Sequence, residues 1–181
     1  QEKSIGKVLK DHIVVIGFGL NGQNVANAAM DAGIRCAVVE EDPDLARKAQ
    51  LVGLTVLVGD ATNTHLLEQA HVERARVVVV AISDAPQTLK IVAGVRSLSS
   101  TAHIIVRTRY VKDIQSNFDV GANEVIPEEF ETSIEIFHRV LRKYLVPEAK
   151  IQALVASIRS DHYGMLRGTT GNRVRKKEEP L

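Results

Sequence analysis

HIVVIGFGLNG, residues 12–22, is the stretch that decides the fold of this chain. Residues 12–16 form an apolar, β-branched run, which is typical of a buried strand. The spacing G-x-G-x-x-G follows at residues 17–22, and a helical stretch at about residues 21–32 comes after it. A glycine loop between a strand and a helix is the context in which this spacing indicates a nucleotide-binding unit.

Outward from this loop, strand-like and helix-like stretches alternate. Further strands are predicted at residues 37–39, 55–58, 77–82, 104–106 and 124–126, with helices between them at about 43–52, 85–98 and 112–120. Thr62 or Asn63 is predicted to cap a short helix that ends near Ala70. Such alternation predicts a parallel sheet covered on both faces. The predicted fold class is α/β, a Rossmann-like doubly wound sheet of six parallel strands in the order 3-2-1-4-5-6, followed by C-terminal helices for dimerisation.

Composition divides the chain into five parts, predicted as a linker (1–10), the nucleotide-binding domain (11–127), a dimerisation helix (128–146), a second helix (147–167) and a disordered tail (168–181). The dimerisation helix places apolar residues at helical spacing, namely Phe130, Ile134, Phe137 and Leu141. The second helix does the same with Ile151, Leu154, Val155, Ile158 and His162. A finished six-stranded sheet needs neither helix, so we expect their apolar faces to bury against something else.

Composition also excludes several classes of protein. The net charge is +1 and aromatic residues make up only 4% of the chain. Neither value favours nucleic acid as a partner. The one cysteine, Cys36, lies in a predicted strand, where a small core residue is expected and no intrachain disulfide can form. No apolar run approaches the roughly 20 residues of a membrane-spanning helix. The chain begins at Gln1 and not at Met, so we expect it to be a piece of a longer protein.

Carboxylates end two of the predicted strands. Glu40 lies 18 residues beyond Gly22, where a dinucleotide-binding fold places a carboxylate on the ribose hydroxyls, and Glu41 could share the role. A carboxylate there repels a 2′-phosphate, which favours NAD or an adenosine nucleotide over NADP. After the third strand, Asp60 could accept from the adenine amine while the N–H of Ala61 donates to a ring nitrogen. The alternatives are solvated loop charges at Glu40 and Glu41, and a simple turn at Asp60.

Arginines follow the fifth predicted strand. Arg107 and Arg109 are expected at the same sheet edge as the glycine loop, where guanidinium groups suit a phosphate. They could instead form surface salt bridges, and Glu128 and Glu129 could pair with them or cap the next helix. The candidate ligand contacts are therefore Gly17, Phe18, Gly19, Leu20, Asn21, Gly22, Glu40, Glu41, Asp60, Ala61, Arg107 and Arg109.

The sequence offers no catalytic machinery that we can identify. No G-K-[ST] follows the glycine loop, the six histidines show no metal-ligand spacing, and no nucleophile–base pair is evident. A dehydrogenase would also need a substrate domain, for which the chain has no room. We therefore predict a binding domain with no metal and no enzymatic activity. The alternative is a fragment of a small NAD-dependent oxidoreductase.

At this point the sequence resembles the regulator-of-potassium-conductance family, also called the RCK, TrkA-N or KTN domain. The resemblance covers about residues 11–147. It rests on the glycine loop 16–22, on Gly59-Asp60-Ala61-Thr62, on Arg107-Thr108-Arg109 and on residues 121–128. Residues 128–133 and 158–163 resemble the cytoplasmic tails of Kef-type monovalent cation:proton antiporters most.

The resemblance implies a regulatory domain on the cytoplasmic face of the cell membrane, fused to or docked on a potassium or sodium transporter. It implies AMP or NAD(H) as the ligand, and a homodimer through the helix at 128–145. A free-standing transporter subunit stays open as an alternative. Glutathione-gated Kef proteins carry an arginine in the glycine loop where this chain has Leu20, and the second lobe of the regulator module is missing here. For this chain, then, the resemblance does not imply glutathione control.

Overall fold

A computed structural model describes residues 9–164 of the chain. Its contacts divide into two compact units, one that ends at Ile126 and one that begins at Pro127. Residues 1–8 of the predicted linker lie outside the described residues, as do 165–167 of the predicted second helix and the whole predicted tail.

The first unit is built on one six-stranded sheet. Its strands are β1 (Ile13–Ile16), β2 (Cys36–Glu40), β3 (Thr55–Val58), β4 (Val77–Val80), β5 (His103–Thr108) and β6 (Glu124–Pro127). They lie in the order β3-β2-β1-β4-β5-β6. The pairs are parallel, and Val15 at the centre of β1 lies opposite Val38 of β2 and Val79 of β4. The predicted Rossmann-like sheet of six parallel strands and its strand order are confirmed.

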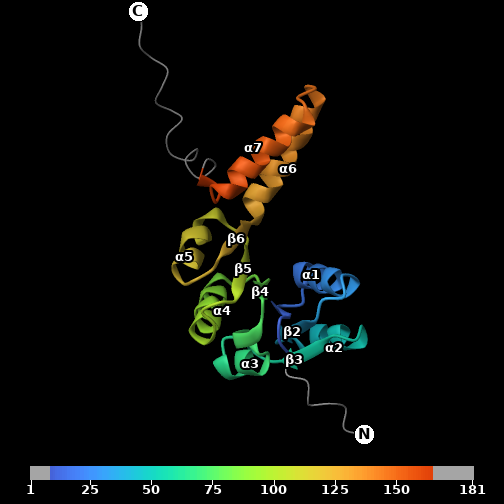
Figure 1. The fold of residues 1–181 in the computed structure, drawn as a ribbon, viewed down its shortest axis with the longest axis vertical. Coiled ribbons are helices and arrows are strands. Elements are labelled where there is room, and N and C mark those ends of the chain that lie inside the picture. Colours follow the sequence, from blue (N-terminus) through green and yellow to red (C-terminus); the bar gives the residue numbers. More distant parts are fainter. Residues whose placement is uncertain (1–8, 165–181) are drawn as a thin grey trace, which may run out of the picture. The chain divides into compact units, whose positions relative to one another are not determined.

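Helices cover both faces of this sheet. They are α1 (Leu20–Asp31), α2 (Pro43–Leu51), α3 (Thr64–Gln69), α4 (Ala85–Leu98) and α5 (Ile114–Asp119). Figure 1 shows α1 and α2 on one side of the strands and α4 and α5 on the other. Cys36 lies in the core beneath α1 and α2, where burial raises the pKa of its thiol to about 11. The prediction of a structural core cysteine is confirmed.

Several boundaries differ from the predicted ones. Strand β4 ends at Val80 and not at residue 82, which leaves Ile82 and Ser83 in a loop at the carboxyl edge of the sheet. Strand β5 runs to Thr108, so the prediction that Arg107 follows this strand is wrong. Its pairing with β4 ends where Val80 lies opposite Val106, and β5 continues for two residues beyond that pair.

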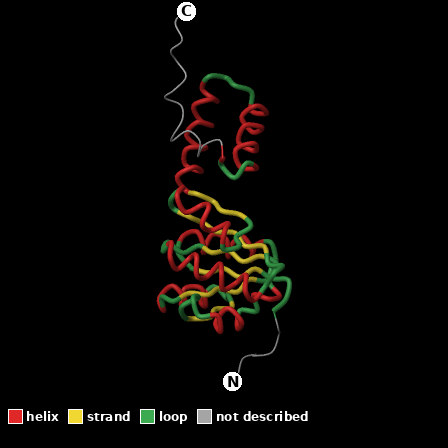
Figure 2. Tube along the Cα trace, turned by 90° about the vertical axis from the view of Figure 1, so that its left-hand side faces the viewer, coloured by secondary structure: helices red, strands yellow, loops and turns green. Residues whose placement is uncertain are grey.

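The second unit is a hairpin of two helices, α6 (Glu128–Lys143) and α7 (Glu148–Ser160), which run side by side in Figure 2. Its core contains Ile134, Ile151, Val155, Ile158 and Tyr163, with Phe130, Phe137, Leu141 and Val146 packed against it. Of the apolar face predicted on the first helix, Ile134 is buried in this core, and Phe130, Phe137 and Leu141 are partly buried against it. The sequence did not predict this partner: the apolar faces of the two helices pack against each other.

The predicted face of α7 is also partly wrong. Leu154 points outward and is 37% exposed. The helix ends at Ser160, before His162, and Tyr163 turns back into the hairpin core with 6% of its surface exposed. Among residues 9–164, no helix is long and apolar enough to cross a membrane.

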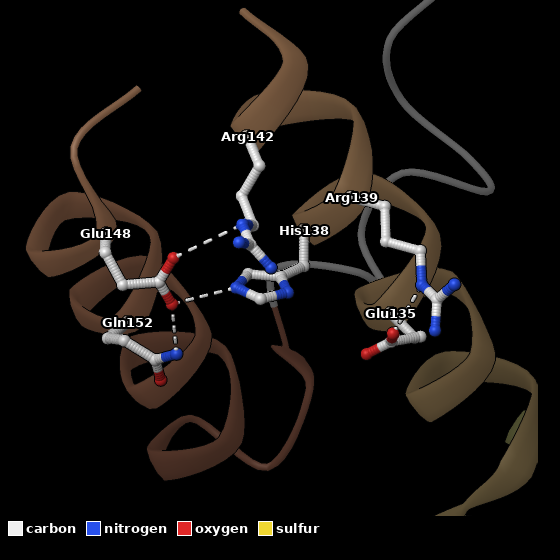
Figure 3. A network of polar contacts seen from close by, with 6 residues as sticks. All are labelled: Glu135, His138, Arg139, Arg142, Glu148 and Gln152. Carbon is white, nitrogen blue, oxygen red and sulfur yellow. Dashed lines mark hydrogen bonds and ion pairs between the residues drawn. The ribbon is translucent and has the colours of Figure 1, made fainter. Parts of the chain in front are cut away.

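Polar contacts connect the two helices of the hairpin along its length. Glu148 of α7 accepts from Gln152 at 2.7 Å and lies 3.0 Å from the Nε2 atom of His138 on α6 (Figure 3). Nearer the other end of the hairpin, Glu131 accepts from Arg159 and Tyr163, each at 2.6 Å. Burial by itself would raise the pKa of Glu131, but these two hydrogen bonds outweigh it and hold the pKa below its ordinary value.

Candidate functional site

The glycine loop connects β1 to α1 in a conformation that only glycine allows. Gly17 has φ 94°, and a Cβ atom there would lie 2.8 Å from Ile82. A Cβ at Gly22 would lie 1.9 Å from the carbonyl oxygen of Gly17, so the first turn of α1 lies against the loop where no side chain fits. Gly19 caps α1 without a side-chain hydrogen bond, and nothing lies within 4 Å of the place where its side chain would be. The first turn of α1 therefore presents backbone N–H groups to an incoming anion.

Glu40 ends β2 beside this loop and is 8% exposed. One carboxylate oxygen accepts from the N–H of Phe18 at 2.5 Å, and the other accepts from the N–H of Asp42 at 2.9 Å. A carboxylate offers about four acceptor positions, so both oxygens retain capacity for ribose hydroxyls. Glu40 therefore holds the glycine loop to β2 and keeps its carboxylate at the carboxyl edge of the sheet.

Asp60 follows β3 at the same edge, and its environment differs from that of Glu40. It is exposed, and its two carboxylate oxygens accept from the N–H and the hydroxyl of Thr62, each at 2.8 Å. The backbone hydrogen bond from Thr62, followed by the side-chain one, lowers the pKa of Asp60. Thr62 is thus engaged with Asp60, and Asn63 is the residue that caps α3, through the N–H of His65.

A hollow opens at the carboxyl ends of these strands, and we call it the first hollow. Five predicted contact residues line it, namely Gly17, Glu40, Glu41, Asp60 and Ala61. Eight further lining residues were not among the predicted contacts, and they include Gly59, Ser83, Asp84 and Gln87. The signal for Ser83 and Asp84 was their place directly after a central strand, at the edge where a doubly wound sheet binds its ligand.

The remaining residues of the predicted glycine-loop set do not line the first hollow. The side chain of Phe18 packs in the core and is 3% exposed, and Gly22 lies beneath Gly17. Leu20 is 76% exposed at the start of α1. Gly19 and Asn21 belong to the same loop and first turn. These residues would therefore contact a ligand only through their backbone groups or at the rim of the first hollow.

Arg107 and Arg109 line a second hollow, which shares Ile82, Ser83 and Asp84 with the first. The guanidinium group of Arg107 donates to the hydroxyl of Ser83 at 3.1 Å and to the carbonyl of Ile82 at 3.4 Å. The predicted site is therefore two neighbouring hollows that meet at the loop after β4. Within residues 9–164, no cluster of histidine, cysteine and carboxylate side chains could hold a metal ion.

Comparison with known proteins places this geometry in a family. The model of the TrkA-N domain matches residues 13–128. A protein of Alkalimonas amylolytica that is named as a K(+) efflux antiporter, KefB, is 30% identical over 88% of this chain and 24% of its own length. A glutathione-regulated potassium-efflux system protein of Haemophilus influenzae is 26% identical over 84% of this chain and 25% of its own length. The chain thus spans about a quarter of the length of these relatives.

Solved structures share the fold at lower identity. The TrkA-N domain of the inner membrane protein YbaL from Escherichia coli superposes with a TM-score of 0.68 at 23% identity, over 76% of this chain and 98% of that one. The Kef C-terminal domain of Shewanella denitrificans, in an AMP-bound form, has a TM-score of 0.67 at 20% identity, over 83% of this chain and 91% of that one. The GsuK channel bound to NAD has a TM-score of 0.64 at 23% identity, over 76% and 24% of the two chains.

Proposed function

The chain belongs to the TrkA-N domain family, and we propose that it is a regulatory domain that binds an adenine nucleotide on the cytoplasmic face of a potassium or sodium transport system coupled to protons. The observation that carries this proposal is the first hollow, in which a glycine loop, Glu40 and Asp60 meet at one sheet edge. Relatives named as potassium-efflux proteins support the transport role, and solved relatives with AMP or NAD support the ligand.

The bound nucleotide would lie across the strand ends. The adenine would reach Asp60 and the N–H of Ala61, and the ribose would reach Glu40 and Glu41, all of which line the first hollow. The phosphate would face the open N-terminus of α1 at Gly19. In this arrangement each part of the ligand meets the group that suits its charge.

Arg107 would contact the anionic part of the same ligand. Its guanidinium group donates to Ser83 and Ile82, which line both hollows, so it stands at the junction of the two. A charged donor at the junction can reach a phosphate that extends from the first hollow. Arg109 would contribute at longer range, since it is exposed and lies 5.5 Å from the ring centroid of Tyr110.

Calorimetric titration of the chain with AMP, ADP, NAD and NADH tests the proposal. We expect one saturable site for at least one of these nucleotides, and weaker binding of NADP because Glu40 repels a 2′-phosphate. Absence of binding to all four would overturn the nucleotide assignment. Steady turnover of NADH with a simple carbonyl substrate would favour the other candidate, a fragment of a small NAD-dependent oxidoreductase.

We also propose that the chain forms a homodimer through α6, by a different face from the predicted one. Ile136, Val140 and Tyr144 follow one another at intervals of four residues, and they are 60%, 49% and 80% exposed. Residues at this spacing share one face of a helix. This stripe is the apolar surface of α6 that α7 leaves uncovered.

The charges of α6 suit an antiparallel pairing with a second copy of itself. Its first turn carries Glu128, Glu129 and Glu131, and its last turn carries Arg142 and Lys143. A twofold axis near the middle of the stripe would set the acidic end of one helix beside the basic end of the other. Such an isologous contact is self-complementary, as a closed dimer requires.

A further inference from the structure

The amino edge of the sheet, opposite the two hollows, carries a set of contacts that the proposed function does not use. Arg35 and Arg76 come directly before the parallel strands β2 and β4, and residues 9–12, which we call the lead-in, come directly before β1. Arg35 donates to the carbonyl of Lys10 at 2.5 Å. Arg76 donates twice to the carboxylate of Asp11, at 2.5 and 2.8 Å. The lead-in is thereby clamped where the chain enters the sheet.

Two backbone hydrogen bonds join the lead-in to the turn between α3 and β4, and we call this set of contacts the joint. The N–H of Asp11 donates to the carbonyl of Arg74, and the N–H of Arg76 donates to the carbonyl of His12, each at 2.9 Å. Asp11 and His71 adopt left-handed backbone conformations, with φ of 54° and 53°. One strained residue therefore lies on each side of the joint, and the contacts between the two sides have to offset that strain.

His12 lies at the centre of the joint and has no exposed surface. Its Nε2 atom lies 2.9 Å from the carbonyl oxygen of Ala70, which only accepts, so Nε2 carries the proton of the neutral ring. The Nδ1 atom is buried and has no hydrogen-bond partner in the described part of the chain. Protonation at Nδ1 would therefore bury a positive charge and a donor without an acceptor. Burial is the main reason that the pKa of His12 lies below its ordinary value of 6.5.

The charged groups around the ring do not offset this cost. Arg35 and His71 disfavour a further positive charge beside them. Glu73 favours it, but its carboxylate already lies 3.3 Å from the Nδ1 atom of His71. Asp11 favours it too, but its carboxylate accepts both hydrogen bonds from Arg76. Each of these carboxylates is shared with another side chain, and the neutral ring is the form that suits the joint.

We propose that His12 is a proton-operated catch for the lead-in. While its ring is neutral, the ring holds the lead-in to the turn between α3 and β4. Protonation releases the joint locally, because opening the few contacts that cover the ring costs less than unfolding the whole sheet unit. Under the proposed function, on which this last step rests, release of the lead-in would make the position of the regulatory domain depend on cytoplasmic pH.

Amide hydrogen exchange of the chain, followed by NMR, tests the catch. The N–H groups of Asp11 and Arg76 donate across the joint, whereas the N–H of Ala81 donates to Ile16 at the other edge of the sheet. Protection factors are compared at about pH 7.5 and about pH 5.5, so that the pH dependence of the intrinsic exchange rate cancels. We expect the two joint amides to be less protected than Ala81 at both pH values, as local opening requires. Their protection should fall by up to about tenfold at the lower pH, the limit over this range for one group that titrates at 6.5 when exposed.

Two variants assign the proton to its residue. His12→Gln keeps a donor for Ala70 and does not titrate, so it should abolish the fall in protection of the joint amides. His71→Asn is the matched control and should keep the fall, because it removes the neighbouring histidine while asparagine tolerates the left-handed conformation.

Three outcomes would overturn the catch. In the unmutated chain, the joint amides could match Ala81 at both pH values, which would make global unfolding their route of exchange, or their protection could be independent of pH. Neither observation needs a variant, so the test holds even where His12→Gln does not fold. The third outcome is that His71→Asn, and not His12→Gln, removes the pH dependence. Nucleotide binding is no part of these readouts, so the proposed function can fail while the catch stands.

Discussion

At the scale of single residues, two carboxylates of the first hollow differ in what holds them. Glu40 is nearly buried and accepts from two backbone N–H groups, one of them in the glycine loop. Asp60 is exposed and is held by Thr62 alone. Substitution of Glu40 therefore disturbs the loop as well as the ligand, whereas substitution of Asp60 disturbs the ligand with little effect on the fold.

This difference makes Glu40→Gln a test of cofactor choice. The amide removes the charge that repels a 2′-phosphate, so the ratio of NADP to NAD affinity should rise. Its NH₂ group would also face a backbone N–H, either that of Phe18 or that of Asp42, so affinity for every nucleotide should fall somewhat. Titration with NAD and NADP measures both effects. Glu68→Gln, at an exposed position of α3 that lines neither hollow, is the control, and an unchanged affinity ratio in Glu40→Gln would contradict the assigned role.

Asp60 and Arg107 should respond to different parts of the ligand. Arg107→Ala removes a charged donor, and hydrogen bonds to charged groups contribute roughly 1.5–3 kcal/mol, which is about 10- to 150-fold in affinity. The loss should be large for AMP and small for adenosine, which has no phosphate. Asp60→Ala should weaken both ligands about equally and relax discrimination against guanine nucleotides. Equal losses for AMP and adenosine in Arg107→Ala, or a lower melting temperature without ligand, would make Arg107 a structural residue.

At the scale of elements, the sequence predicted strands and helices well because their apolar periods differ. It could not predict the partner of an apolar face. The pattern of α6 predicts a covered apolar stripe that includes Phe130 and Ile134. The same pattern would arise whether α7 or a second chain covered this stripe. Nor could it divide the site into two hollows. Only the structure shows that β5 runs to Thr108, so that Arg107 lies inside a strand and reaches the loop at Ser83.

Two faces of α6 should therefore respond differently to the same substitution. Phe137 packs against the hairpin core, so Phe137→Glu should lower the melting temperature, because an unpaired buried charge costs several kcal/mol. Val140 is 49% exposed, so Val140→Glu should leave the melting temperature nearly unchanged and convert the dimer to a monomer. Light scattering at micromolar concentration and thermal denaturation provide the two readouts. A monomer in the unmutated chain would contradict the proposed interface.

At the scale of the whole molecule, the two units should respond to acid in different pH windows. In the hairpin, the pKa of Glu131 is lowered from its ordinary value of 4.5, so the stability it contributes is lost only as pH falls below that value. In the sheet unit, the pKa of His12 is lowered from 6.5, chiefly because burial disfavours the charged ring. Its imidazole has no exposed surface, and its Nε2 atom lies 2.9 Å from the carbonyl of Ala70. The sheet unit should therefore weaken first on acidification.

The direction of this pH effect follows from how His12 binds a proton in the folded and in the unfolded chain. Below pH 6.5 the unfolded chain takes up a proton that the folded chain refuses, so stability falls as pH drops from 6.5 toward the lowered pKa. The folded state loses at most about 1.4 kcal/mol of stability per pH unit. For a chain of this size, each kcal/mol lost lowers the melting temperature by roughly 2–4 °C. His12→Gln keeps an amide donor for Ala70 and does not titrate, so its melting temperature should depend less on pH. His65→Gln, at a position that is 72% exposed, is the control. Melting temperatures measured at about pH 7.5 and about pH 5.5 decide the matter, since equal losses in His12→Gln and the unmutated chain would remove His12 as the source of acid sensitivity.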